Sequence, residues 1–324
     1  MSCRIRKWIH LGKRIDQMVT GERHIVFLVN PVSGGKAKEK LIHSISKSAE
    51  NAHIRFEIMS TEADGNYDTL KNKIQRERIT DVVICGGDGS IRSVVGALRG
   101  EAVRFGIIPA GSGNGLARAA RIPLNTIEAL KVIIRPYTLL VDGFLVNNQF
   151  SCMLTGLGFD AHVAHQFAQK KRRGFLTYLI ETIRHFFNAS SYRFNVRLLH
   201  TDQEVQAYFI SIANSNQFGN DVTIAPCALL NDGKLDIVVV NNMNKVRLLW
   251  EMLHQIRSGK VQPADSEKFR KNIHYVQASS LQINNPEMAP LHIDGDPVET
   301  SAYIDIQIIP NAFQLLVPEK SSLQ

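Results

Sequence analysis

The stretch best suited to chemistry is Gly-Gly-Asp-Gly-Ser at residues 86–90, which follows an apolar run and precedes a run with helical spacing. Its glycines let backbone N–H groups approach a ligand closely, and N–H groups at the start of a helix bind anions. A carboxylate at Asp88 would repel bare phosphate, but it can organise the water shell of a magnesium ion that accompanies phosphate. The turn is therefore predicted to bind a phosphate group, with Asp88 managing the metal.

Two more glycine-rich stretches, NPVSGGK (30–36) and PAGSGNG (109–115), each follow a strand-like run. The second adds Ser112 and Asn114 as hydrogen-bond donors. Three such loops favour a polyphosphate ligand over three unrelated tight turns. The P-loop pattern is absent, because the Gly-Lys pair at 35–36 is followed by alanine.

The chain around these loops divides into two regions with different patterns of expected secondary structure. Strand-like and helical runs alternate over residues 24–142, which predicts parallel strands with helical crossovers, an α/β (Rossmann-like) domain that binds ligands beyond the carboxyl ends of its strands. Short β-rich runs dominate residues 143–324 and predict an antiparallel sandwich or barrel, interrupted by helices at 161–188 and 245–257. Residues 1–23 form a basic extension.

Composition limits the classes of partner. The 324 residues are 44% hydrophobic and 21% charged, with a net charge of +8, which favours anionic partners such as nucleotide phosphates or an acidic membrane surface. Nucleic acid would rest on net charge alone and is not expected. No apolar run is long enough to span a bilayer, and the four scattered cysteines are expected to be buried free thiols. We therefore expect a cytoplasmic protein and leave peripheral membrane attachment open.

The motifs NPVSGGK, GGDGS, PAGSGNGLARA, GFDA, NDGKLDI and HIDGDPVE, in this order, resemble the diacylglycerol kinase catalytic-domain superfamily, which includes soluble bacterial lipid kinases and the sphingosine and ceramide kinases. The resemblance covers roughly residues 24–318. It implies an N-terminal nucleotide domain and a C-terminal β-sandwich domain with the active site between them. It also implies that the last residues return to the first domain.

The same resemblance implies roles for individual residues. Asp294 matches the general base, which removes the proton from an alcohol as the phosphoryl group transfers. Asp88 would organise magnesium, with Asp142 linked to it through water and Asp296 as a further metal residue. Asp232, with the carbonyl oxygens of Leu229 and Lys234, matches the ligands of a structural magnesium. The nucleotide would be bound by Asn30, Thr61, Gly86, Gly87, Asp88, Gly89, Ser90, Arg92, Gly111, Ser112 and Asn114.

Two positions depart from the family pattern. Arg92 stands where many relatives have asparagine, so this side chain either reaches phosphate or faces solvent. Asp296 stands where glutamate is usual, which keeps the charge but shortens the reach toward a metal.

The leading hypothesis is an ATP-dependent lipid kinase that uses Mg²⁺ and phosphorylates a hydroxyl of a diacylglycerol-like or sphingoid lipid. One alternative is a kinase of the NAD kinase type, which shares GGDG. Another is a catalytically silent, lipid-binding regulatory protein, motivated by Arg92 and Asp296. The basic and apolar stretch at 169–187 either docks on an anionic membrane surface or packs on the sandwich, and homodimerisation is left open.

Overall fold

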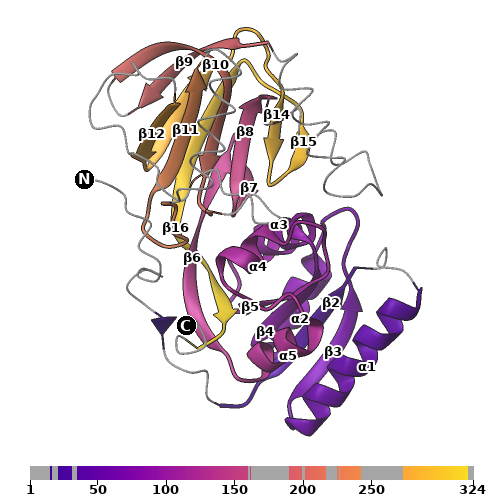
Figure 1. The fold of residues 1–324 in the computed structure, drawn as a ribbon. Coiled ribbons are helices and arrows are strands. Elements are labelled where there is room, and N and C mark those ends of the chain that lie inside the picture. The colour runs from indigo at the N-terminus through magenta and orange to yellow at the C-terminus, as the bar shows by residue number, and fades with distance from the viewer. Residues whose placement is uncertain are drawn as a thin grey trace.

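The computed structural model describes residues 15–16, 21–30, 35–159, 161, 190–198, 201–216, 225, 227–241 and 273–319. Figure 1 shows two bodies, an α/β domain and a β domain, joined by β6 (Tyr137–Val146) and β16 (Tyr303–Val317), which run through both. The two-domain fold expected from the sequence is confirmed.

The α/β domain is built on parallel strands in the order β3-β2-β4-β5. Every residue of β4 is buried, as the continuous apolar run predicts for a parallel strand covered on both faces. The carboxyl ends of the strands are aligned, since Val29 pairs with Cys85 and Gly86 pairs with Pro109. The elements are β2 (His24–Val29), α1 (Gly35–Asn51), β3 (Arg55–Ser60), α2 (Asp68–Glu77), β4 (Asp81–Gly86), α3 (Asp88–Leu98), β5 (Arg104–Pro109), α4 (Gly115–Ala119) and α5 (Thr126–Ile134).

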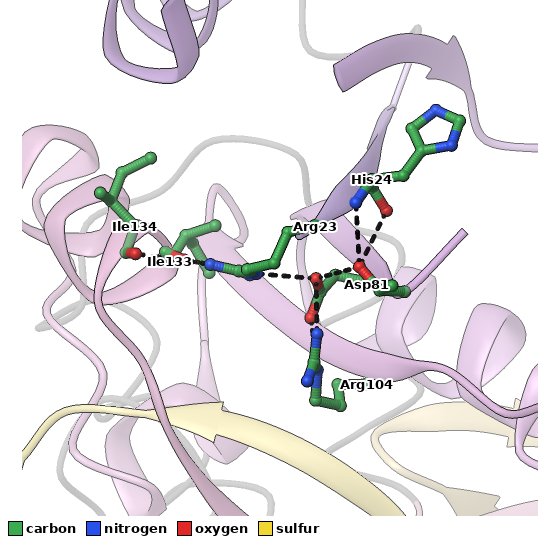
Figure 2. A network of polar contacts seen from close by, with 7 residues as sticks. Arg23, His24, Asp81, Arg104, Ile133 and Ile134 are labelled. Atoms are coloured by element: carbon green, nitrogen blue, oxygen red, sulfur yellow. Dashed lines mark hydrogen bonds and ion pairs between the residues drawn. The ribbon is translucent and has the colours of Figure 1, made fainter. Parts of the chain in front are cut away.

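A buried ion network fastens the amino ends of these strands, opposite the glycine loops (Figure 2). Asp81 is fully buried and accepts hydrogen bonds from Arg23 Nε at 2.9 Å and Arg104 Nε at 2.7 Å. Arg23 also donates to the carbonyl of Ile133 at 2.6 Å, which ties the end of α5 to the sheet. Because each of these charged side chains bonds an opposite charge or a carbonyl, we interpret the network as one that stabilises the fold.

The β domain is a sandwich whose strand β10 serves both sheets. The first half of β10 pairs with β9, and its second half pairs with β8 and β11. Alternate side chains from both sheets, among them Phe144, Phe194 and Ile237, fill the core between them. The other strands are β7 (Gln149–Ser151), β8 (Leu154–Gly158), β9 (Tyr192–Leu198), β10 (Thr201–Ala213), β11 (Leu235–Asn241), β12 (Ile273–Ala278), β13 (Ser280–Asn284), β14 (Leu291–Ile293) and β15 (Asp296–Val298).

The last strand joins the two domains. β16 pairs antiparallel with β6 on either side of an irregularity between Ile309 and Phe313, and its end runs parallel to β5 through Gln314 and Leu315. The Phe313 ring packs edge-on against Phe105, with centroids 5.9 Å apart. The C-terminal strand therefore extends the sheet of the α/β domain beyond β5.

One expectation about the cysteines is wrong. Cys85 and Cys152 are buried free thiols as expected, but Cys227 is disulfide-bonded. The segment 169–187, the helix expected at 245–257, nearly all of the helix expected at 161–188 and most of the extension 1–23 lie outside the described residues. Among the helices that the structure describes, none combines the length and apolar character needed to cross a membrane.

Candidate functional site

Two of the glycine-rich loops touch each other at the carboxyl ends of β4 and β5. The amide of Ala110 donates to the carbonyl of Gly86 at 3.0 Å. A Cβ placed on Gly111 would lie 2.5 Å from the Cα of Gly87, and one on Gly87 would lie 3.0 Å from the Cα of Gly111. Only glycine at both positions allows this approach, which brings the backbones of the two loops together.

Asp88 links the starts of two helices. It is the first residue of α3, and its carboxylate accepts from the amides of Gly115 at 3.0 Å and Leu116 at 3.4 Å, at the start of α4. Burial raises the pKa of Asp88, the backbone hydrogen bonds oppose the rise, and the nearby negative charge of Asp294 adds to it. The carboxylate therefore stands between the two loops and within electrostatic reach of Asp294.

Asn30 and Ser90 join the end of β2 to this site. The amide side chain of Asn30 donates to Ser90 Oγ at 3.2 Å, and the backbone N–H of Asn30 donates to the carbonyl of Cys85 at 3.3 Å. Thr61, just after β3, donates its N–H to the carbonyl of Val29 at 3.2 Å. The predicted nucleotide residues on β2, β3 and β4 thus follow strand ends at one edge of the sheet.

Asn114 shapes the loop that carries it. Its φ is 52°, its Oδ1 accepts from the N–H of Gly111 at 2.9 Å, and its Nδ2 donates to the carbonyl of Gly111 at 2.8 Å. This side chain therefore closes the loop on itself, whereas Ser112 at the loop tip is exposed.

Asp294 sits in a cradle of donors at the tip of the β14–β15 hairpin. The φ values of Asp294 and Gly295 are 50° and 84°, as a tight hairpin turn requires. The carboxylate oxygen Oδ1 accepts from Ser151 Oγ at 2.7 Å and from the amides of Met153 and Leu154 at 3.1 and 3.0 Å. The other oxygen, Oδ2, accepts from the amide of Cys152 at 3.2 Å.

The cradle sets the chemistry of this carboxylate. Asp294 is only 6% exposed, and burial raises its pKa, while the hydrogen bonds and the positive charge of Arg92 oppose the rise. A raised pKa suits a group that must accept a proton near neutral pH. Oδ1 is saturated by three donors and Oδ2 has one, so Oδ2 is the atom suited to accept a hydroxyl proton.

The turn beyond Asp294 lies against α3. Arg92 donates through Nη2 to Asp296 Oδ2 at 2.9 Å and through Nη1 to the carbonyl of Ile293 at 3.3 Å. A Cβ on Gly89 would lie 3.1 Å from Asp296 Oδ2. The structure thus brings two of the predicted site residues, Arg92 and Asp296, into direct contact across the domain boundary.

The other predicted metal residues form a separate group. Asp142 is 1% exposed and accepts from the amides of Gly233 and Asn311, each at 2.7 Å. Asp232 Oδ1 accepts from the amide of Lys234 at 3.1 Å, and burial together with the charge of Asp142 raises the pKa of Asp232. Leu229 lies on the same turn before β11.

The donor types suit magnesium, because carboxylate and carbonyl oxygens are its usual protein ligands. However, the contacts divide the predicted ligands into two sets, one around α3 with Asp88 and Asp296 and one around the turn before β11. Among the described residues, only His24, Glu57 and Glu77 bring three ligand atoms within 4.8 Å of one another, and Lys73 is already paired with both glutamates. The predicted ligands therefore fall into two groups, and a magnesium ion at either group would take its remaining ligands from water or substrate.

Sequence reasoning missed several partners of these carboxylates. Ser151 and the amides of residues 152–154 hold Asp294 across 140 to 143 residues of chain. Asn214 donates to the carbonyl of Asp142 at 2.7 Å and to that of Cys152 at 3.4 Å, so it connects the two carboxylate groups. No spacing in the sequence signals such contacts, because backbone donors leave no residue-type pattern.

Comparison with known families matches both domains. Residues 24–146 match the family described as diacylglycerol kinase catalytic domain, and residues 154–317 match the YegS C-terminal NAD kinase beta sandwich-like domain. Among solved structures, a putative diacylglycerol kinase from Bacillus anthracis is similar, with a TM-score of 0.76, 20% identity, and coverage of 94% of this chain and 100% of that one. At this identity the likeness shows the fold.

Named relatives are similar along most of their length. A probable lipid kinase YegS-like of Alcanivorax borkumensis is 25% identical, over 87% of this chain and 98% of that protein. One from Chromohalobacter salexigens is 24% identical, over 78% of this chain and 81% of that protein. The chain therefore belongs to the lipid kinase family that joins a diacylglycerol kinase catalytic domain to a YegS-type β-sandwich domain.

Proposed function

We propose that this kinase transfers the γ-phosphoryl group of Mg-ATP to a hydroxyl group of a diacylglycerol-like or sphingoid lipid. The observation that carries the proposal is the position of Asp294. It lies on the β14–β15 turn of the β-sandwich domain, and Arg92 of α3, the helix that begins at the glycine turn, bonds Ile293 and Asp296 on either side of Asp294. A proton acceptor and a phosphate-binding turn from different domains therefore face a common site.

The chain's own residues account for binding and proton transfer. The amides at the start of α3 hold the phosphates, because the first N–H groups of a helix lack helical partners, and the loop around Gly111 packs beside them. Asp294 Oδ2 takes the proton of the lipid hydroxyl as the oxygen–phosphorus bond forms. The bond between the γ-phosphorus and the oxygen that leaves with ADP breaks in the same transfer.

Magnesium would be held by the carboxylates described above. Asp88 would hold it through water, and Asp142, Asp232 and the carbonyls of Leu229 and Lys234 would hold a second ion. When bound, the ion neutralises charge on the phosphates.

The lipid acceptor is supported by the relatives, whose names describe probable lipid kinases. The net charge of +8 also supports work at an anionic membrane surface. The match of the second domain to an NAD kinase-like sandwich makes NAD⁺ the small-molecule acceptor to compare.

The test incubates the full chain with labelled Mg-ATP and either vesicles of a total lipid extract or NAD⁺, and identifies the labelled product by mass. A phosphorylated lipid supports the proposal. Labelled NADP⁺ would contradict it and would show that the protein acts as an NAD kinase. Asp294→Asn should lose about 10²-fold or more in turnover, the typical contribution of a general base. Asp202→Asn, which changes an exposed carboxylate paired with Arg197, is the matched control and should retain activity.

If no lipid is labelled while Asp294→Asn and the wild type bind vesicles alike, the protein is a silent lipid-binding member of the family. Circular dichroism of each variant separates lost chemistry from lost folding.

A further inference from the structure

The two positions at which this chain departs from its family pattern are bonded to each other. Arg92 lies on α3 of the nucleotide domain, and Asp296 lies on β15 of the sandwich domain, 204 residues along the chain. Their side chains are 23% and 47% exposed, so the pair is partly shielded from water. This ion pair joins two domains next to the proposed proton acceptor, so it can fix the position of that residue. A surface pair within one element could not.

Arg92 bonds both of the strands that flank the turn carrying Asp294. Ile293 and Asp296 are cross-strand partners in the β14–β15 pairing, and Asp294 and Gly295 form the turn between them. Arg92 bonds the carbonyl of the first partner and the carboxylate of the second. The planar guanidinium supplies two donors in a fixed fork, which a lysine cannot reproduce.

We infer that Arg92 and Asp296 form a cross-domain clamp that positions Asp294 against the glycine turn, and that neither side chain is a direct ligand of nucleotide or metal. Its catalytic consequence rests on the proposed kinase function, whereas its structural consequence does not. The family resemblance of the motifs implied that Arg92 binds nucleotide and that Asp296 binds magnesium. In the clamp, the guanidinium provides the positive charge that a cation would otherwise bring to Asp296.

The close packing at Gly89 supports this assignment. Asp296 Oδ2, the oxygen that Arg92 holds, lies where a Cβ on Gly89 would be only 3.1 Å away. The first turn of α3 therefore limits the space beside this carboxylate. If the clamp is lost, the turn that carries Asp294 is released from α3, while its bonds to Ser151 and residues 152–154 and the pairing of β14 with β8 still hold it on the sandwich side.

The test measures hydrogen exchange at the amides of Met153 and Leu154, which donate to Asp294, in the full chain without ligand. Arg92→Met and Asp296→Asn should each speed exchange about tenfold, a change of about 1.4 kcal/mol in local opening. The double variant should be no faster than Arg92→Met, because that variant already removes the bond to Asp296 together with the bond to Ile293. Arg92→Lys should lie between wild type and Arg92→Met.

The control Arg76→Gln removes one positive charge from α2, where Arg76 bonds Glu77, and should leave these amides unchanged. Binding measurements separate a clamp from ligands. Titration with Mn²⁺ should give the same affinity for Asp296→Asn and wild type, and calorimetry with Mg-ATP should give the same affinity for Arg92→Met and wild type.

Unchanged amide exchange in Arg92→Met would overturn the clamp. A tenfold or greater loss of Mn²⁺ affinity in Asp296→Asn alone, or of Mg-ATP affinity in Arg92→Met alone, would return these residues to the roles of metal and nucleotide ligands. The exchange arm needs no substrate, so a failure to phosphorylate any lipid leaves it standing. With a lipid substrate in hand, turnover should fall in the same order as amide protection.

Discussion

Substituting Gly111 by alanine tests the contact between the two glycine loops. The new Cβ would lie 2.5 Å from the Cα of Gly87 and 3.1 Å from Asn114 Oδ1. Carbon atoms at rest lie about 3.5–4.0 Å apart, so one loop must move by roughly 1 Å. The atom in the way is backbone, which cannot rotate aside as a side chain would. We expect the overpacking to cost about 2 kcal/mol and to lower the Tm by about 4–8 °C.

The matched control is Gly100→Ala, because a Cβ at Gly100 meets no atom within 4 Å. Thermal unfolding of both variants gives the Tm, and calorimetry with Mg-ATP gives the affinity. Gly111→Ala should also weaken Mg-ATP binding about tenfold, because movement at Gly87 shifts the start of α3, whose amides are proposed to hold the phosphates. If the two variants share a Tm within about 1 °C, the loops are not in the contact described and the reasoning about this site fails.

Three further predictions concern buried groups. Burial alone would raise the pKa of Asp81, but hydrogen bonds from Arg104 and Arg23 hold it below its ordinary value, so this carboxylate stabilises the fold above its unfolded pKa and loses that effect as the pH falls. Asp81→Asn should therefore cost about 3–5 kcal/mol in urea unfolding at pH 7, with a smaller loss at acid pH. Asp142→Asn turns an amide N–H toward a backbone donor and should cost about 1–3 kcal/mol, measured in the same way. Cys85 and Cys152 are buried, which raises both thiol pKa values, so neither should react with a thiol reagent until the protein is unfolded.

Each of these has an outcome that contradicts it. Equal stability of Asp81→Asn and wild type at pH 7 would mean that the network in Figure 2 contributes nothing. A fully stable Asp142→Asn would mean that the turn before β11 is held by other contacts. Rapid labelling of Cys152 in the native protein would mean that the cradle around Asp294 opens readily.

Local patterns in the sequence determined the parallel strands and the places where they end. The apolar run 82–85 is buried on both faces, and glycines follow the ends of β4 and β5, as the sequence predicts. The period of buried positions and the residue types of turns depend on a few neighbouring residues, so both can be recognised from the sequence alone. The ordered motifs likewise identified the family and the two-domain architecture.

Only the tertiary structure decided which donors surround each carboxylate. The cradle of Asp294, the bond between Arg92 and Asp296 and the pairing of β16 with β5 join residues that are far apart in the chain. Most of the donors in the cradle are backbone amides, which every residue except proline carries, so no pattern of residue types predicts these contacts. Sequence thus determined which groups could do chemistry, and long-range packing decided what each one touches.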